Sequence, residues 1–127
     1  MEEYAVGFDF GSLSVRGLLV NVQTGEELCA AVYNYPHGIM SEALPDGTAI
    51  PQTFALQHPL DYLMGIAFCS KKLLRETGIA PEQIIGIGID STASTIMPVD
   101  DAGVPLCLKT EFRSNPQAWL KLSLIHI

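Results

Sequence analysis

Long apolar stretches are missing from this sequence: nowhere do apolar residues continue for the roughly 18 to 20 positions that a membrane-spanning helix needs. The opening residues Met1 to Tyr4 also lack the basic segment and apolar run of a secretion signal. We therefore expect a cytoplasmic protein that does not contact a membrane.

Basic residues are scarce as well. Seven Lys and Arg stand against 14 Asp and Glu, for a net charge of −7. Nucleic-acid binding draws most of its affinity from clustered cations that neutralise phosphates. This balance excludes a large nucleic-acid interface.

Cysteine and histidine are few and widely spaced. Cys29, Cys69 and Cys107 form no CxxC pair and lie in apolar sequence, so we expect buried free thiols. Among the candidate metal ligands, His37 and His126 stand isolated, with no second ligand at metal spacing. His58 is explained by its position at the start of a predicted helix. The single Trp119 is expected to pack rather than to stack on a ligand.

What the sequence does contain is an apolar fraction of 48% in 127 residues, enough for a globular domain with an ordinary core. Segments 4–10, 15–22 and 27–34 read as strands separated by short turns, which predicts an antiparallel meander. Residues 35–57 lose all periodicity among prolines and glycines and predict a long loop.

A helix is predicted over 58–78, with Pro59 at its start and Gly78 as its C-terminal cap. Its apolar positions share one face and comprise Leu60, Leu63, Met64, Ala67 and Leu74. Residues 84–90 form a short apolar run typical of a central strand covered on both faces. Residues 95–108 read as a hairpin that turns at 101–103.

This order of elements predicts an α/β fold with a mixed sheet: an antiparallel three-strand meander, a crossover helix and a central parallel strand. It resembles the opening of a ribonuclease H-like domain, the actin/hexokinase type of ATPase. A right-handed crossover would place the strand ending at Asp90 beside the strand ending at Asp9. Since open α/β sheets bind ligands at the carboxyl ends of their strands, both acids would border one cleft.

The stretch GFDFGSLSVRGLLV, residues 7–20, carries groups suited to phosphate chemistry. Asp9 could hold hydrated Mg²⁺, and Gly11 permits a tight turn with close backbone approach. Ser12 and Ser14 offer donors, and Arg16 is a cation within reach of a phosphate. The same residues also suit an ordinary hairpin turn. Because the Asp-x-Gly tripeptide is a weak signal, both interpretations stay open.

The stretch DSTAST, residues 90–95, places small polar residues directly after an apolar strand. Its small hydroxyl residues could hydrogen-bond a polyol while leaving room for a sugar, so we expect the substrate to lie against Asp90, Thr92, Ala93 and Ser94. A turn stabilised by Ser and Thr capping bonds is an equal alternative.

Together these stretches resemble the N-terminal region of the FGGY-family carbohydrate kinases, most closely the ribulokinases. The motifs that carry the resemblance span residues 4–122: GFDFGSLSVRGLLV, ALQHPLDY, IGIGIDSTASTIMPVDDAGVPLCL and EFRSNPQAWLKL. DFGS with a downstream arginine is shared across the family, whereas DSTAST and FRSNPQAW point to ribulokinase.

The resemblance implies that Ser12 and Arg16 lie near the phosphates of ATP and Asp9 near Mg²⁺. It places Thr92 and Ala93 where the family contacts its sugar. The implied reaction transfers the γ-phosphate of ATP to L-ribulose in L-arabinose breakdown.

Members of this family are several times longer, and their catalytic base lies beyond residue 127. We therefore expect residues 1–122 to form part of the N-terminal kinase domain, and residues 123–127 to be a non-native tail. On this interpretation the chain alone has negligible kinase activity, because it contains no catalytic base. Any homo-oligomer would be formed by the longer enzyme.

Three alternatives stay open at this point. A ribonuclease H-like nuclease would use the same first-strand carboxylate with further acids around two metal ions. A non-catalytic sugar-binding module would bind without turnover. Within the kinases, xylulose, another ketopentose or a pentitol would differ from L-ribulose by only one or two hydrogen bonds.

Overall fold

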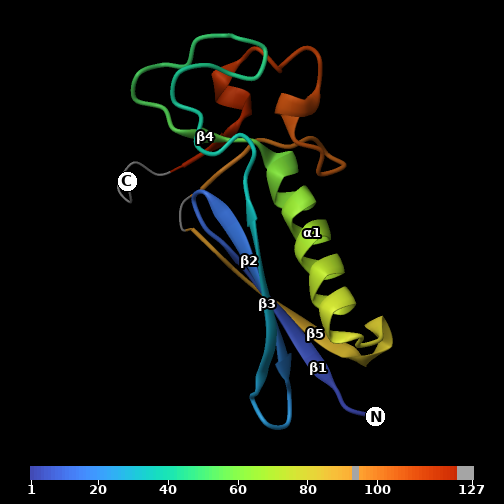
Figure 1. Ribbon diagram of the computed structural model, residues 1–127. Helices are drawn as coiled ribbons and strands as arrows, with labels where there is room; N and C mark the ends of the chain where they lie inside the picture. Colours follow the sequence, from blue (N-terminus) through green and yellow to red (C-terminus); the bar gives the residue numbers. More distant parts are fainter. Residues whose placement is uncertain (93–94, 123–127) are drawn as a thin grey trace. The chain divides into compact units, whose positions relative to one another are not determined.

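The structure, a computed structural model, describes residues 1–92 and 95–122 (Figure 1). The chain folds into two compact units. The first comprises residues 1–35 and 62–92, and the second comprises residues 36–61 together with residues from 93 onward. The predicted sugar contacts Ala93 and Ser94, the tail 123–127 and His126 lie outside the described residues.

A four-stranded mixed sheet forms the first unit, in the order β3-β2-β1-β5. The strands are β1 (Tyr4–Phe10), β2 (Ser14–Asn21), β3 (Glu27–Asn34) and β5 (Ile84–Ser91). The pairs β1–β2 and β2–β3 are antiparallel, and β1–β5 is parallel. The predicted meander and the parallel strand beside the first strand are both confirmed, with β2 shifted by one residue from the predicted 15–22.

Helix α1 (Pro59–Thr77) crosses over between β3 and β5 and ends where the sequence predicted. Gly78 follows it at φ 71° and donates its N–H to the carbonyl of Leu74 at 2.9 Å, which closes the last turn. The short 3₁₀ helix η1 (Pro81–Gln83) then leads into β5. Within the described residues, none of the helices combines the length and apolar character that crossing a bilayer requires.

The side of α1 that packs on the sheet is not the predicted one. Gly65, Cys69 and Leu73, spaced four apart, are buried, whereas Leu63 is 61% and Met64 58% exposed. Small residues decide this: a Cβ at Gly65 would overlap the Val15 side chain, and a Cβ on Gly17 would lie 3.0 Å from that of Cys69. The helix therefore approaches the sheet closely at Gly65 and Cys69, and the predicted Leu63 and Met64 remain outside.

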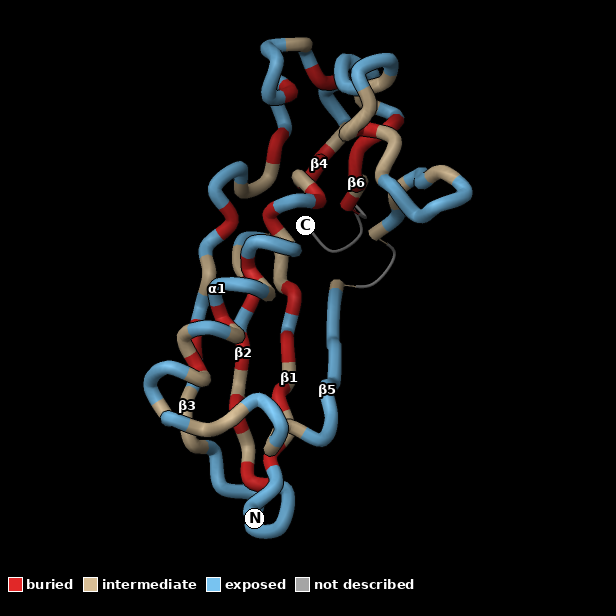
Figure 2. The backbone as a smooth tube through the Cα atoms, turned by 90° about the vertical axis from the view of Figure 1, so that its right-hand side faces the viewer, coloured by how far each residue is buried: buried red, intermediate tan, exposed pale blue. Residues whose placement is uncertain are grey.

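Alternation along β1 and β2 builds the core beneath the helix (Figure 2). The buried cluster comprises Tyr4, Val6, Phe8, Phe10, Val15, Leu19, Ala31, Tyr35, Cys69 and Leu73. The prediction that the strand at 84–90 is covered on both faces is wrong, since Ile87 is 67% and Ile89 68% exposed. Among the described strands β5 pairs with β1 alone, so it is an edge strand.

The second unit has little regular structure. It contains β4 (Leu56–Gln57) paired antiparallel with β6 (Leu120–Lys121), and the 3₁₀ helices η2 (Leu106–Leu108) and η3 (Pro116–Ala118). Its own buried cluster comprises Met40, Leu44, Ile50, Leu56, Cys107, Ala118 and Trp119. The long segment predicted as a loop thus contributes several core residues.

The predicted hairpin over 95–108 is confirmed only at its turn. Gly103 adopts φ 80°, and Asp100 Oδ1 accepts the N–H groups of Ala102 and Val104, both at 2.9 Å. Beyond the turn a single bridge joins Val99 to Pro105. Pro105 has no N–H to extend a ladder, and the chain enters η2 instead.

Candidate functional site at the strand ends

Two carboxylates lie side by side at one end of the sheet of the first unit. Asp9 on β1 and Asp90 on β5 are direct partners in the parallel register, so both strands reach their carboxyl ends together. Both side chains are exposed. Adjacent strands are about 4.8 Å apart, so the two negative charges lie close together on the face of the sheet opposite the buried side chains.

Arg16 extends this row onto a third strand. It is the antiparallel partner of Asp9 on β2 and is also exposed. Among the described residues, no ion pair within 4.0 Å joins Arg16 to either acid, since the pairs found are His37–Asp61 and Lys109–Asp100. A cation and two carboxylates therefore face outward from three neighbouring strands, available to a ligand.

Glycines form the floor next to this row. Gly7 and Gly88 are register partners two positions before Asp9 and Asp90, and a Cβ on either would meet nothing within 4 Å. Together with Leu18 they line a hollow of about 420 Å³ that also includes the row of charges. These glycines were not predicted from the sequence, although the repeated Gly-x-Asp spacing signals them, because residues two apart on a strand share a face.

The turn between β1 and β2 is tight and is closed by its own backbone. Gly11 donates its N–H to the carbonyl of Ser14 at 2.8 Å, and a Cβ on Gly11 would lie 3.2 Å from that oxygen. Ser14 lies two positions before Arg16 and so on the same face of β2. Ser12 lies in the turn and is partly buried. The predicted phosphate-binding residues are thus brought together at one sheet end.

Of the predicted sugar contacts, the structure describes two. Asp90 accepts the N–H of Ser91 at 3.0 Å, and Thr92 donates its N–H to the Phe10 carbonyl at 3.3 Å. The second bond links the ends of β5 and β1. Thr92 therefore lies at the same sheet end as the turn at Gly11.

The chemistry of this donor set fits a hydrated Mg²⁺ ion with a polyphosphate. Mg²⁺ uses one or two protein carboxylates, keeps several waters and takes its remaining ligands from phosphates. Asp9 supplies an exposed carboxylate, and the glycine floor leaves space that a side chain would fill. Arg16 adds a positive charge on the same face, where phosphate oxygens would lie.

A second cluster of ligating side chains lies in the second unit, where the sequence predicted isolated histidines. Asp61, only 4% exposed, accepts the ring Nδ1–H of His37 at 2.8 Å and its backbone N–H at 3.1 Å. His37 stacks on His58 at 4.3 Å between centroids. The prediction that His37 has no second ligand nearby is therefore wrong, because the ligand atoms of these three residues lie within 4.8 Å of one another.

The hydrogen bonds of this cluster argue for a structural role. Both Asp61 oxygens are occupied by His37, and His58 Nδ1 accepts the N–H of Leu60 at 3.2 Å. These bonds already use the Asp61 carboxylate and the Nδ1 atoms of both rings. The cluster fastens the loop that begins at Pro36 to the first turn of α1.

The remaining predicted residues are largely structural. Cys69 and Cys107 are buried as expected, and burial raises the pKa of both thiols, that of Cys107 to about 11. Cys29 is only half-buried, with its Sγ 3.4 Å from a Glu76 oxygen, so the expectation of burial is wrong for this residue. Trp119 packs in the second core, as predicted.

Known proteins similar in sequence are sugar kinases. Ribulokinases from Geobacillus thermodenitrificans, Bacillus licheniformis and Halalkalibacterium halodurans are 43%, 45% and 39% identical over 122, 111 and 121 residues. These matches cover 95%, 87% and 94% of this chain but 22%, 20% and 22% of those enzymes. The chain spans about a fifth of the length of the curated relatives it matches.

Solved structures agree on the fold. A gluconate kinase from Lactobacillus acidophilus superposes with a TM-score of 0.64 at 16% identity, covering 81% of this chain and 18% of that one. A xyloylose kinase from Brucella ovis superposes with a TM-score of 0.61 at 18% identity, covering 80% of this chain and 19% of that one. No family model matches the chain. The matches favour a sugar kinase over a nuclease, and the chain is similar over 87–95% of its length to part of the enzymes named ribulokinase.

Proposed function

We propose that this chain supplies the phosphate-facing sheet of an enzyme that transfers the γ-phosphate of ATP to the terminal hydroxyl of L-ribulose. The observation that carries the proposal is the register of β1 and β5, which makes Asp9 and Asp90 neighbours at one sheet end. The homology to enzymes named ribulokinase supports the choice of sugar.

Each strand-end residue has a role in this proposal. Asp9 holds Mg²⁺ through water, and the metal when bound offsets the charge of the polyphosphate. Gly11 allows the phosphates to approach the backbone, while Ser12, Ser14 and Arg16 donate hydrogen bonds to them.

The sugar is assigned to the other strand end. Asp90 and Thr92 hydrogen-bond its hydroxyls, and Ala93 and Ser94 contact the sugar as well. Phosphoryl transfer depends on holding donor and acceptor in line. Placing phosphates at the end of β1 and the sugar at the end of β5 brings the two within reach of each other.

Paramagnetic relaxation tests the nucleotide half of the proposal directly. Mn²⁺ replaces Mg²⁺ at oxygen sites and broadens NMR signals near it. We expect Mn²⁺ with ATP to broaden the amide signals of Asp9, Gly11 and Asp90 in the 127-residue chain, and Asp9→Asn to weaken this effect. Asp101→Asn, which removes an exposed carboxylate of the second unit, is the matched control and should change nothing. Broadening centred on His37 and His58 instead would overturn the assignment.

A further inference from the structure

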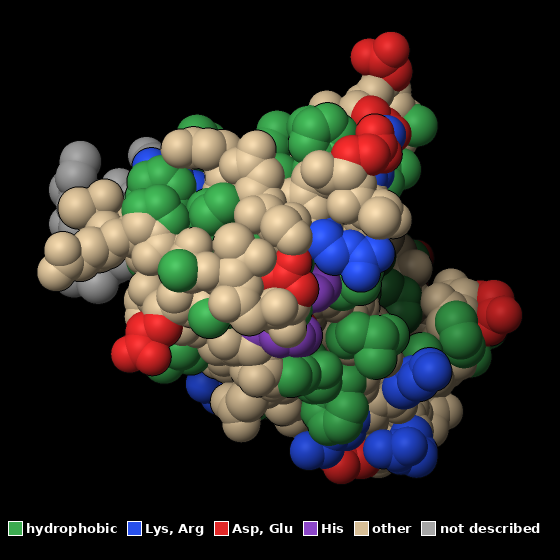
Figure 3. Space-filling view, turned by 90° about the horizontal axis from the view of Figure 1, so that it is seen from above, with side chains coloured by type: hydrophobic (Ala, Val, Ile, Leu, Met, Phe, Trp, Pro, Cys, Tyr) green, Lys and Arg blue, Asp and Glu red, His purple; other side chains and the backbone are tan. Residues whose placement is uncertain are grey.

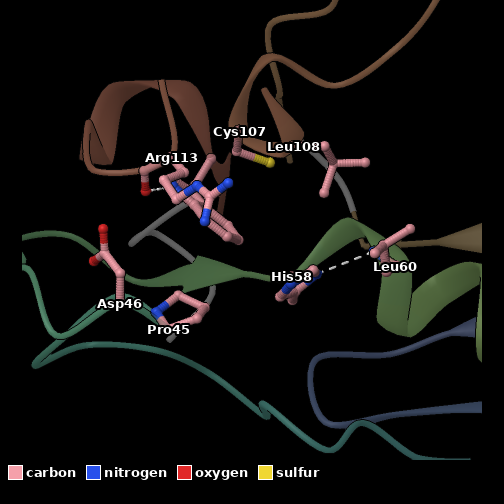
Figure 4. A pocket seen from close by; sticks show the side chains of 8 residues that line it. Pro45, Asp46, His58, Leu60, Cys107, Leu108 and Arg113 are labelled. Atoms are coloured by element: carbon pink, nitrogen blue, oxygen red, sulfur yellow. Dashed lines mark hydrogen bonds between the residues drawn. The ribbon is translucent and has the colours of Figure 1, made fainter. Parts of the chain in front are cut away.

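A pocket of about 320 Å³ lies within the second unit, and its lining residues differ from those of the strand-end hollow. We call it the His58 pocket. Figure 4 shows its walls: Pro45 and Asp46 come from one loop, His58 and Leu60 from the entry into α1, and Cys107, Leu108 and Arg113 from the segment that contains η2.

Part of the wall of the His58 pocket is apolar and fixed. Leu60, Leu108 and Trp119 contribute to it. Trp119 donates its Nε1–H to the Arg113 carbonyl at 3.1 Å, so the indole is held in place and its N–H is used. Cys107, with a thiol pKa of about 11, is uncharged at neutral pH and adds to the apolar surface.

One negative and one positive group face each other across the rim. Hydrogen bonds from Ser114 and Thr48 lower the pKa of Asp46 to about 2, so this carboxylate is charged at neutral pH. Arg113 bonds only weakly to Thr110 Oγ1, at 3.4 Å, and within the described residues it makes no ion pair. The pocket is therefore polar at its rim but carries no net charge.

His58 adds a directed donor. Its Nδ1 accepts the Leu60 N–H, so the neutral ring carries its proton on Nε2. Burial, together with the neighbouring His37, lowers the pKa of His58 and keeps the ring neutral at physiological pH. Histidine side chains are visible at the surface with an acidic and a basic side chain beside them (Figure 3).

We propose that the His58 pocket binds a small neutral polyhydroxylated molecule the size of a pentose or pentitol. One charge of each sign gives no net attraction to an anion or to a cation, whereas a hydroxyl can donate to Asp46 and accept from Arg113. The apolar part of the wall receives the C–H face of the molecule. At about 320 Å³ the volume lies at the small end of ligand sites, which suits a sugar rather than a nucleotide. This site goes beyond the proposed function, because none of its residues belongs to the strand ends.

Tryptophan fluorescence gives a direct readout, because Trp119 is the only tryptophan in the chain. We expect titration with L-arabitol to produce a saturable change in the Trp119 fluorescence of the 127-residue protein. Arg113→Ala should weaken the apparent affinity about tenfold, the loss typical of a charge-assisted hydrogen bond. Arg75→Ala removes the same charge from the exposed side of α1 in the first unit and should leave the affinity unchanged.

Further variants separate this site from the strand-end site. If Asp9→Asn or Asp90→Asn abolishes the change while Arg113→Ala does not, the polyol binds at the strand ends and the pocket assignment is wrong. Tighter binding of glycine betaine, a zwitterion without hydroxyls, would overturn the ligand class. If the circular dichroism of Arg113→Ala shows that the variant does not fold, the ¹H–¹⁵N NMR spectrum of the wild type tests the proposal instead. L-Arabitol must then shift the Trp119 indole and Arg113 side-chain signals, and unchanged signals refute the proposal.

Discussion

The two units of the chain use their polar side chains in opposite ways. In the first unit, backbone ladders between four strands hold the fold, and Asp9, Arg16 and Asp90 project from them without ion pairs among the described residues. In the second unit the strands are two residues long. There, side chains such as Asp61 and Asp100 bond backbone groups of the loops.

This difference separates polar residues that are free to bind from those that stabilise the fold. A sheet satisfies its own backbone, so polar side chains at its end are left to a ligand. Loops without ladders need side-chain acceptors for their N–H groups, and an aspartate used in this way is committed to structure. The His37–Asp61–His58 cluster looks like a metal site by composition, but the hydrogen bonds from His37 place Asp61 in the second class.

Truncating the core of the first unit should have the largest effect. Leu73 is 1% exposed beneath the sheet, so Leu73→Ala removes buried methyl groups and leaves a cavity. We expect a loss of about 2–5 kcal/mol in the free energy of unfolding, measured by urea denaturation with circular dichroism.

Leu63→Ala on the same helix is the matched control. Leu63 is largely exposed, so its truncation should change stability by less than about 0.5 kcal/mol. Equal losses for both variants would mean that the larger apolar side of α1, and not its Gly65–Cys69–Leu73 side, packs on the sheet. If Leu73→Ala does not fold, Leu73→Val offers a smaller cavity for the same comparison.

A smaller effect is expected from pH on the second unit. Burial lowers the pKa of His58, so the folded state binds a proton less readily than the unfolded state does. The stabilisation is complete above the ordinary histidine pKa of about 6.5 and is lost as the pH falls from there through the lower pKa of the folded state. Nearby Asp61 opposes the shift, and nearby His37 reinforces it.

The contribution of His58 to the pH dependence of stability can be isolated with His58→Gln, which keeps a polar side chain but does not titrate. Unfolding followed by Trp119 fluorescence should lose stability between pH 6.5 and 5 more steeply in the wild type than in the variant. The difference between the two proteins then reports the titration of His58 together with its coupling to His37 and Asp61. Identical slopes would show that His58 is as readily protonated when folded as when unfolded.

Much of the first unit could be predicted from the sequence because its signals are local. Alternating apolar residues fix β1 and β2, and Pro59 and Gly78 fix the limits of α1. The parallel placement of β5 follows from the handedness of crossovers. With these elements in place, Asp9 and Asp90 must share a sheet end, which the register confirms.

Other features depend on contacts between distant residues, which no local pattern reveals. The packing side of α1 was missed because hydrophobicity favours Leu63 and Met64, whereas steric fit at Gly65 and Gly17 decides. The exposure of β5 could not be predicted, because an apolar run does not reveal whether other strands or helices cover it. The meeting of His37 with Asp61, 24 residues apart, likewise depends on the path of a loop.

A chimaeric enzyme tests the central claim most directly. Residues 1–122 would replace the matching segment of the Geobacillus thermodenitrificans ribulokinase, to which this chain is 43% identical. We predict L-ribulose-dependent formation of ADP, a kcat lowered about a hundredfold or more by Asp9→Asn, and no loss with Asp101→Asn. A chimaera whose Asp9→Asn variant turns over as fast as its parent would contradict the account.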